Sequence, residues 1–128
     1  IKKMVEKMKI SDSVIFLENI TNMHEYLSAM DIFLLPSNFE GLPLVGVEAQ
    51  ANGVKCLFSS NIDKRLKINS NVKILDLNLK KWIKECKIEE RIESEKNLRE
   101  HGYDIKEQAK KLSHIYNEGM NKSGNIFD

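Results

Sequence analysis

The sequence predicts an α/β fold with a parallel sheet, and three observations support this. Apolar runs of four residues recur along the chain, which is typical of strands that are covered on both faces. Segments of about a dozen residues with helical periodicity separate these runs, so successive strands are expected to run parallel. The chain has 128 residues, 41% of them hydrophobic, which is enough for one domain with one core.

Composition narrows the classes of function. The chain has 20 Lys and Arg residues and 19 Asp and Glu residues, so it has no basic excess that would indicate a nucleic-acid partner. No apolar run approaches the roughly 18 residues of a membrane span, and no secretory signal precedes the first helix, so any membrane contact would be peripheral. Cys56 and Cys86 have neither metal-type spacing nor a redox motif, and Cys56 suits a core strand. We expect a cytoplasmic protein, with the inner face of the membrane as the alternative location.

The first 30 residues are expected to form a helix, a strand and a second helix. Apolar residues recur at helical spacing over residues 1–9. A turn at 11–13 leads into the apolar run 14–17, which we interpret as a short buried strand. Thr21 or Asn22 can cap the helix that follows.

The most informative stretch runs from residue 31 to residue 53. An apolar run at 32–35 predicts a buried strand, and the turn-forming residues 37–43 predict a tight loop. A helix follows from Leu44, with Gly53 as its stop. This arrangement points backbone N–H groups and the positive end of a helix dipole out of the carboxyl edge of the sheet. Anionic ligands bind at that edge in open α/β folds.

Two acidic residues, Glu40 and Glu48, flank this turn with seven residues between them. Glu48 is expected about one helical turn after Leu44, and this spacing can bring its side chain back toward the same edge of the sheet. The pair suits a ligand with hydroxyls at both ends and a phosphate in the middle. The alternatives are ordinary ones: Glu40 as a turn cap and Glu48 as a solvated helix residue.

The second half of the chain is expected to continue the strand and helix alternation. Polar residues 62–71 predict an irregular connection. The other expected elements are strands at 55–58 and 72–75, a helix at 77–88 burying Leu79, Trp82, Ile83 and Cys86, a charged helix within 89–100, and a last helix that Asp104 caps, with Ile105, Ala109, Leu112, Ile115 and Tyr116 on its apolar face. We expect the domain to cover residues 1–120 and residues 121–128 to form a flexible tail.

Other polar residues offer weaker candidates. His24, His101 and His114 lack a neighbouring Ser, Cys or Asp constellation, so none is nominated as a base. Lys64, Arg65 and Lys67 form a basic cluster that could face a phosphate, although a charge run is usually solvated surface. Phe16 and Trp82 are interpreted as core residues rather than stacking platforms.

The segment FEGLPLVGVEAQANGVKCLFSS resembles the E-x7-E signature of retaining glycosyltransferases of the GT-B fold, family 4 (glycosyl transferases group 1). In that family the signature lies in the C-terminal, nucleotide-sugar donor-binding domain. The preceding VIFLENITNMHEYLSAMDIFLLPS is similar to the family's strand, helix and strand in the same order. The resemblance implies a Rossmann-like parallel sheet with flanking helices. It also implies a truncated domain, since two strand and helix units and an acceptor-binding domain precede residue 1 in complete members.

The resemblance also implies roles for the residues of the turn. Glu40 would be the catalytic residue that contacts the donor sugar, and Glu48 would hold the ribose hydroxyls. The backbone of Gly41, Leu42, Pro43 and Leu44 would cradle the diphosphate. Gly46 departs from the family, where an aliphatic residue is commoner. No cofactor or metal is implied, and no DxD motif is present to hold a metal.

The function implied by the resemblance is transfer of a sugar, with its anomeric configuration kept, from a nucleoside diphosphate to a hydroxyl acceptor in bacterial glycan or polysaccharide synthesis. The expected enzyme is of hexosyltransferase type, with a UDP-sugar as donor and a glycan or lipid-linked acceptor held by the absent N-terminal domain. The 128 residues alone are expected to bind nucleotide weakly and not to turn over. One alternative is a nucleotide-sugar-binding remnant without catalysis. Another is a phosphoacceptor signalling domain, which would need an acidic pair that does not follow Leu17.

Overall fold

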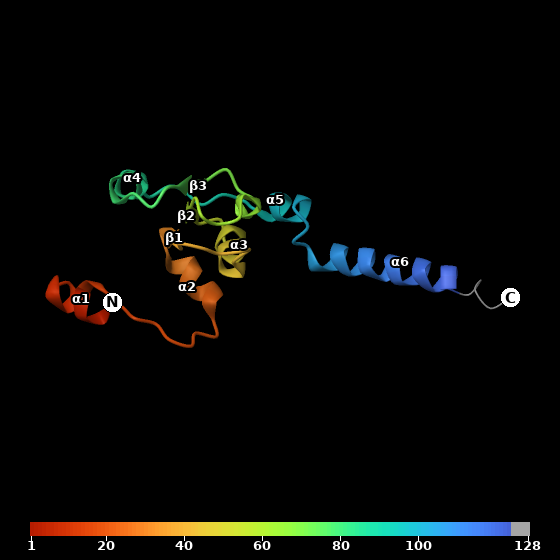
Figure 1. Ribbon diagram of the computed structural model, residues 1–128, viewed down its shortest axis with the longest axis horizontal. Coiled ribbons are helices and arrows are strands. Elements are labelled where there is room, and N and C mark those ends of the chain that lie inside the picture. The colour runs from red at the N-terminus through yellow and green to blue at the C-terminus, as the bar shows by residue number, and fades with distance from the viewer. Residues whose placement is uncertain (124–128) are drawn as a thin grey trace.

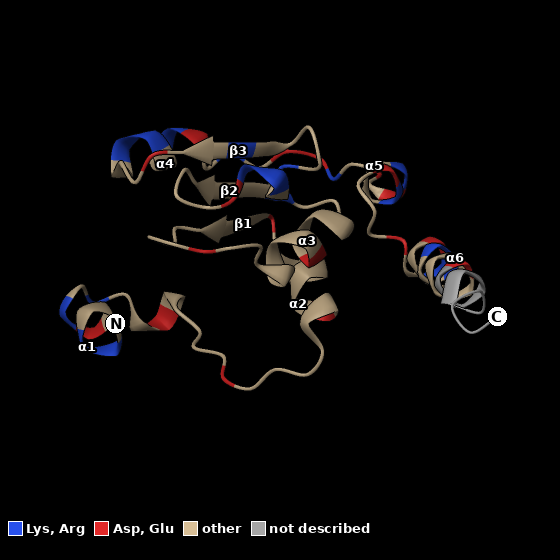
Figure 2. Ribbon diagram, turned by 45° about the vertical axis from the view of Figure 1, so that its right-hand side comes forward, with Lys and Arg blue, Asp and Glu red and all other residues tan. Residues whose placement is uncertain are grey.

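Among the described residues, three parallel strands form the sheet, in the order β1 (Ile32–Leu35), β2 (Lys55–Ser59) and β3 (Val72–Leu75). The computed structural model describes the backbone of residues 1–123 and the side chains of residues 1–118. The central strand β2 is buried at every residue, as expected for a parallel strand with a neighbour on each side. Figure 2 shows the three strands side by side, with α2 and α3 on one side of them. The architecture is the predicted Rossmann-like α/β sheet with flanking helices.

Six helices accompany the sheet in the described part of the chain. The helix α3 packs against β2, and α2 packs against α3 (Figure 1). The helices α1 and α6 extend from opposite ends of the molecule (Figure 1). The bounds are α1 (Lys2–Lys7), α2 (Met23–Ala29), α3 (Leu44–Ala51), α4 (Leu79–Glu85), α5 (Glu95–Glu100) and α6 (Ile105–Ser123), with 3-10 turns η1 (Ser11–Ser13) and η2 (Lys64–Leu66).

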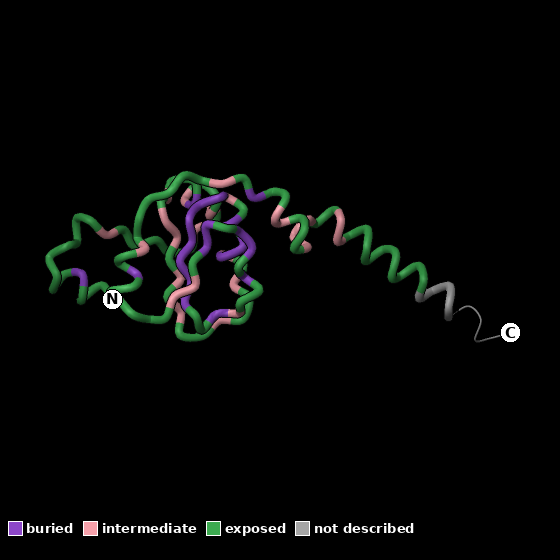
Figure 3. The backbone as a smooth tube through the Cα atoms, turned by 90° about the horizontal axis from the view of Figure 1, so that it is seen from above, coloured by how far each residue is buried: buried purple, intermediate pink, exposed green. Residues whose placement is uncertain are grey.

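The core lies between the sheet, α2 and α3, where Figure 3 shows the buried part of the tube. The rings of Phe33 on β1 and Phe58 on β2 meet edge to face, with 6.4 Å between their centroids. Cys56 is fully buried on β2, as predicted, and burial raises the pKa of its thiol to about 12. Leu27 from α2 and Leu66 from η2 complete the same cluster.

The predicted strand at residues 14–17 is wrong. The segment has no strand partner among the described residues, and Ile15 is 84% exposed. Phe16, predicted to be a core residue, is also exposed. The apolar run has the composition of a buried strand, but a strand needs a neighbouring backbone to hydrogen-bond with it. The described chain offers none beside this segment.

The helix predicted over residues 77–88 is shorter, since α4 ends at Glu85 and Asn78 caps its start with bonds to the N–H groups of Lys80 and Lys81. Trp82 is buried as predicted, and its indole N–H donates to the carbonyl of Asp76 at 2.8 Å. The prediction that the helix also buries its other apolar residues is wrong, because Leu79, Ile83 and Cys86 are exposed.

The charged helix predicted within residues 89–100 forms only in the second half of that range, as α5. Residues 91–94 instead bond to the end of α3. The N–H of Ile92 donates to the carbonyl of Gly53 at 3.2 Å, and the Ser94 hydroxyl donates to the carbonyl of Ala51 at 2.8 Å. Bonds to a neighbouring helix end therefore replace the intrahelical bonds that the local pattern predicted.

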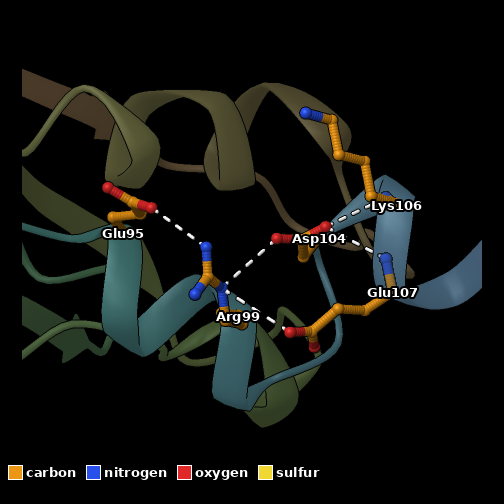
Figure 4. A network of polar contacts seen from close by, with 5 residues as sticks. All are labelled: Glu95, Arg99, Asp104, Lys106 and Glu107. Carbon is orange, nitrogen blue, oxygen red and sulfur yellow. Dashed lines mark hydrogen bonds and ion pairs between the residues drawn. The ribbon is translucent and has the colours of Figure 1, made fainter.

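Asp104 caps α6 as predicted, because its Oδ1 accepts from the N–H groups of Lys106 and Glu107 (Figure 4). The bond from the N–H of Glu107 is the main cause of the lowered pKa of Asp104. Figure 4 also shows Arg99, on α5, contacting Glu95, Asp104 and Glu107.

The apolar face of α6 lies in solvent, since Ile105, Leu112, Ile115 and Tyr116 are all exposed. The helix continues to Ser123, three residues into the predicted tail, and residues 124–128 lie outside the described residues. None of the described helices is both long and apolar enough to cross a membrane.

Candidate functional site

Glu40 lies in the loop that follows β1, at the carboxyl edge of the sheet. It pairs with Ile62 in an isolated parallel bridge, which ties this loop to the one that follows β2. The hydroxyl of Ser37 donates to Glu40 Oε1 at 3.2 Å, and the Glu40 residue is half-buried. The carboxylate is therefore held at the mouth between two strand ends, which is where ligands bind in open α/β sheets.

The N-terminus of α3 follows this loop, and none of the side chains that the structure describes caps it. Pro43 stands at the N-cap, and the first turn holds no acidic residue to compensate the helix dipole. Leu44 at the helix start is 70% exposed. Since Pro43 carries no N–H, the amides available to a ligand before and at this helix start are those of Gly41, Leu42 and Leu44.

Gly41 stands in open space. A Cβ placed there would meet no other atom within 4 Å. Packing within the described residues therefore does not require glycine at this position. The open space leaves the backbone of the loop accessible to a ligand that approaches the helix start.

Glu48 lies on the outer face of α3, in its second turn, about 6 Å along the helix axis from Leu44. It faces α2 across a hollow of about 470 Å³. The opposite face of α3 enters the core through Val47 and Ala49. The residues that line the hollow are Thr21, Met23, His24, Leu27, Glu48, Ala51 and Asn52.

The structure brings some of the candidates together and separates others. Glu40, residues 41–44 and Glu48 form one continuous loop and helix, as predicted. His24, which the sequence did not favour, joins Glu48 in lining the hollow. His101 ends α5 and His114 pairs with Glu118 on α6, so both lie on other elements.

The basic cluster of Lys64, Arg65 and Lys67 is exposed, and its arginine is already engaged. The guanidinium of Arg65 donates to both carboxylate oxygens of Asp63, with Nη2 to Oδ2 at 2.6 Å. This bond lowers the pKa of Asp63 to about 2 and raises that of Arg65. The arrangement leaves Lys64 and Lys67 as the two cations of the cluster that no salt bridge of the described residues uses.

Gln50 is the residue that sequence reasoning missed. It is fully buried on α3, and its side-chain amide bonds the carbonyls of Gly46 at 3.0 Å and Leu66 at 2.7 Å. Its Oε1 accepts from the N–H groups of Ile68 and Asn69 at 2.9 and 3.0 Å. Gln50 therefore anchors the connection 62–71 beside the site. The available signal was one amide side chain on the otherwise apolar inner face of the helix.

Within residues 1–118, no group of three or more metal-ligating side chains gathers that could hold an ion. The site described above consists of backbone amides at the start of α3, the carboxylates of Glu40 and Glu48, and the hollow that Glu48 helps to line.

Comparison with known proteins identifies the family. The family model described as glycosyl transferases group 1 matches residues 1–112. The chain belongs to the group 1 glycosyltransferases. This agrees with the resemblance predicted from the turn between β1 and α3, and the matched range includes every candidate residue of that turn. No solved structure matches the chain significantly.

Three curated relatives match shorter parts of this group 1 glycosyltransferase. This chain is 36% identical over 66 residues to the putative glycosyltransferase EpsF of Bacillus subtilis. The alignment covers 52% of this chain and 17% of EpsF. It is 35% identical over 54 residues to the lipopolysaccharide core biosynthesis mannosyltransferase LpsB of Rhizobium meliloti, and 39% identical over 54 residues to an uncharacterized glycosyltransferase of Haemophilus influenzae. Each of these two alignments covers 42% of this chain and 15% of the relative. The alignments thus cover less than a fifth of each relative's length.

Proposed function

We propose that this chain is the nucleotide-sugar donor-binding part of a retaining glycosyltransferase of the GT-B fold. One observation carries the proposal: the loop after β1 holds Glu40 at the carboxyl edge of the sheet and leads directly into an uncapped helix N-terminus. A carboxylate beside free amides suits a sugar diphosphate, since hydroxyls donate to carboxylates and phosphates accept from amides. The family membership supports the same chemistry.

Each part of the turn has a role in this proposal. The amides of Gly41, Leu42 and Leu44 bind the diphosphate, and the dipole of α3 adds to their field. Glu48 accepts hydrogen bonds from the ribose hydroxyls, in the hollow that α2 and α3 form. Glu40 contacts the donor sugar at the mouth of the site. Pro43 fixes the backbone at the helix start, where its φ is −70°.

The proposed reaction moves the sugar to a hydroxyl acceptor with retention of the anomeric configuration. The acceptor oxygen forms the new bond to the anomeric carbon, while the bond from that carbon to the diphosphate oxygen breaks. The bonding electron pair leaves with the nucleoside diphosphate, and the released diphosphate oxygen takes up the proton that the acceptor hydroxyl loses. The amides at the helix start then stabilise the charge that develops on the leaving group, which is the usual use of preorganised donors.

We further propose a hexosyltransferase that acts in bacterial glycan synthesis, with a UDP-sugar as donor. The mannosyltransferase name of LpsB supports a hexose donor. The acceptor, a glycan or a lipid-linked saccharide, would bind to parts of the protein beyond these 128 residues. The proposed location is cytoplasmic, at the inner face of the membrane where lipid-linked acceptors are available.

The direct test uses a full-length protein that contains this chain. Transfer from UDP-, GDP- and ADP-hexoses to a hydroxyl acceptor is followed by NMR of the anomeric proton. The expected result is a product with the donor's configuration, and a loss of about 100-fold or more in kcat for Glu40→Gln. Inversion of configuration would overturn the retaining mechanism, and unchanged kcat in Glu40→Gln would overturn the role of Glu40. The matched control is Glu6→Gln, on α1 and outside the site.

A further inference from the structure

The guanidinium of Arg91 hydrogen-bonds to the C-terminal ends of two helices, α2 and α3, beside the candidate site. Arg91 Nη2 donates to three carbonyl oxygens at the end of α2: Leu27 at 3.0 Å, Ser28 at 3.0 Å and Met30 at 2.6 Å. Its Nη1 donates to the carbonyl of Asn52 at 3.1 Å and to the Asn52 side chain, at the end of α3. Helix ends leave such carbonyls without intrahelical partners, and a cation there also complements the helix dipole.

The segment that carries Arg91 is itself fixed to α3. Ile92 and Ser94 bond to the carbonyls of Gly53 and Ala51, as described above. Gly53 has a φ of +76°, and a Cβ there would lie 2.2 Å from the carbonyl oxygen of Ile92. We call residues 91–94 the strap. The close approach at Gly53 means that the strap packs directly on the end of α3. The backbone of Arg91 is therefore held in place while its side chain extends to α2.

We propose that Arg91 is a positioning residue for nucleotide binding, which rests on the proposed function. The two walls of the hollow are α2, through Met23, His24 and Leu27, and α3, through Glu48 and Asn52. Arg91 bonds to the ends of both walls, so it fixes their separation and with it the distance from Glu48 to a nucleoside in the hollow. Apart from Arg91, the polar tie between α2 and α3 among the described residues is the bond from Asn52 Nδ2 to Ser28 Oγ at 2.9 Å.

The geometry requires arginine rather than any cation. A planar guanidinium presents five donors in a fixed fork, and Arg91 uses its two terminal nitrogens on two different helices. A lysine ammonium is a single point of charge and cannot span both helix ends in the same way. Arg91→Lys therefore keeps the charge while it removes the link between the two helices.

The test measures the dissociation constant for UDP by amide chemical shifts, in the 128-residue chain. Arg91→Lys is expected to bind UDP about tenfold more weakly than the unsubstituted chain, with its amide spectrum still that of a folded protein. The control is Arg99→Lys, the same change in an arginine whose partners are Glu95, Asp104 and Glu107 near α6. Its UDP affinity is expected to stay within twofold of the unsubstituted chain.

A double-mutant cycle with Glu48→Gln distinguishes positioning from general loosening. If Arg91 acts by placing Glu48, then Arg91→Lys has little further effect once Glu48 is replaced. Equal effects in both backgrounds would overturn the inference, as would unchanged UDP affinity in Arg91→Lys. If Arg91→Lys does not fold, Ser28→Ala serves instead, because it removes the Asn52 tie and Ser28 does not itself line the hollow. It is expected to weaken UDP binding in the same direction by a smaller factor, and unchanged affinity would overturn the inference. Absence of UDP binding by the unsubstituted chain would instead count against the proposed function.

Discussion

Leu66 fills the space that a side chain at position 46 would occupy. A Cβ on Gly46 would lie 2.9 Å from Leu66 Cδ2 and 3.4 Å from Phe58 Cζ. Gly46 is in the first turn of α3, and Leu66 belongs to η2 in the connection after β2. The missing side chain therefore lets the helix that begins at the candidate site pack closely on the neighbouring loop.

We predict that Gly46→Val lowers the free energy of unfolding by about 2 kcal/mol, because the added methyl groups overpack the contact with Leu66. Urea unfolding measures this change. Adding Leu66→Ala empties the same space, so the double variant should be less destabilised than the sum of the two single variants. Strict additivity would contradict the packing relationship.

Gln50→Leu should cost about 3 kcal/mol of folding free energy. The substitution leaves the buried N–H groups of Ile68 and Asn69 without their acceptor, and unpaired buried donors are costly. Denaturant midpoints measure the effect. Gln108→Leu, at a half-buried position on α6, is the matched control and should change stability by less than about 0.5 kcal/mol. A loss in Gln50→Leu no larger than in the control would show that Gln50 does not anchor the connection.

Lys55 carries a buried charge at the start of β2. Its side chain is 1% exposed, and its Nζ lies 2.5 Å from Glu89 Oε1 and 3.0 Å from the carbonyl of Lys87. Glu89→Gln removes the negative partner, and since Glu89 itself is partly exposed we expect a loss of about 1–2 kcal/mol rather than more. Thermal unfolding of Glu89→Gln beside Glu90→Gln, the exposed neighbour, measures the difference. Equal melting temperatures would refute the pairing.

Asp63 should remain ionised well below the usual range for a carboxyl. The hydrogen bonds from Arg65 lower its pKa to about 2 from the ordinary 3.8. Because the folded-state pKa is the lower one, the stabilisation is present above pH 3.8 and is lost as the pH falls toward 2. NMR titration of side-chain carboxyl carbons from pH 6 to 3 should show little change at Asp63, whereas in Arg65→Ala it should titrate near pH 4. A midpoint near 4 in the unsubstituted chain would contradict this.

The sequence predicted best those elements whose signals are local. The strand at Ile32–Leu35, the loop after it and the helix from Leu44 follow from an apolar run, turn-forming residues and a glycine stop within about 20 residues, and the structure confirms all three. The strand at residues 14–17 failed, because its local composition is right but a strand depends on a partner that no local pattern reports.

The contacts that shape the site depend on residues far apart in the sequence. Gln50 bonds partners 16 to 19 residues away, and Arg91 bonds Leu27 from 64 residues away. Neither residue type carries a periodic signal, since each acts by reaching backbone groups that folding brings near. The roles of Glu40 and Glu48, in contrast, come from the resemblance and stay predictions of the proposed function.

The measurement that tests the central claim most directly is a titration of the chain with UDP, GDP and ADP, followed by amide chemical shifts. The proposed donor site predicts shift changes clustered over residues 41–48, with one of the three nucleotides binding more tightly than the others. It also predicts that Glu48→Ala weakens this binding about tenfold or more, whereas Glu6→Ala, an exposed glutamate on α1, does not. Shift changes confined to other elements, or an affinity that Glu48→Ala leaves unchanged, would contradict the claim that the turn between β1 and α3 binds the donor.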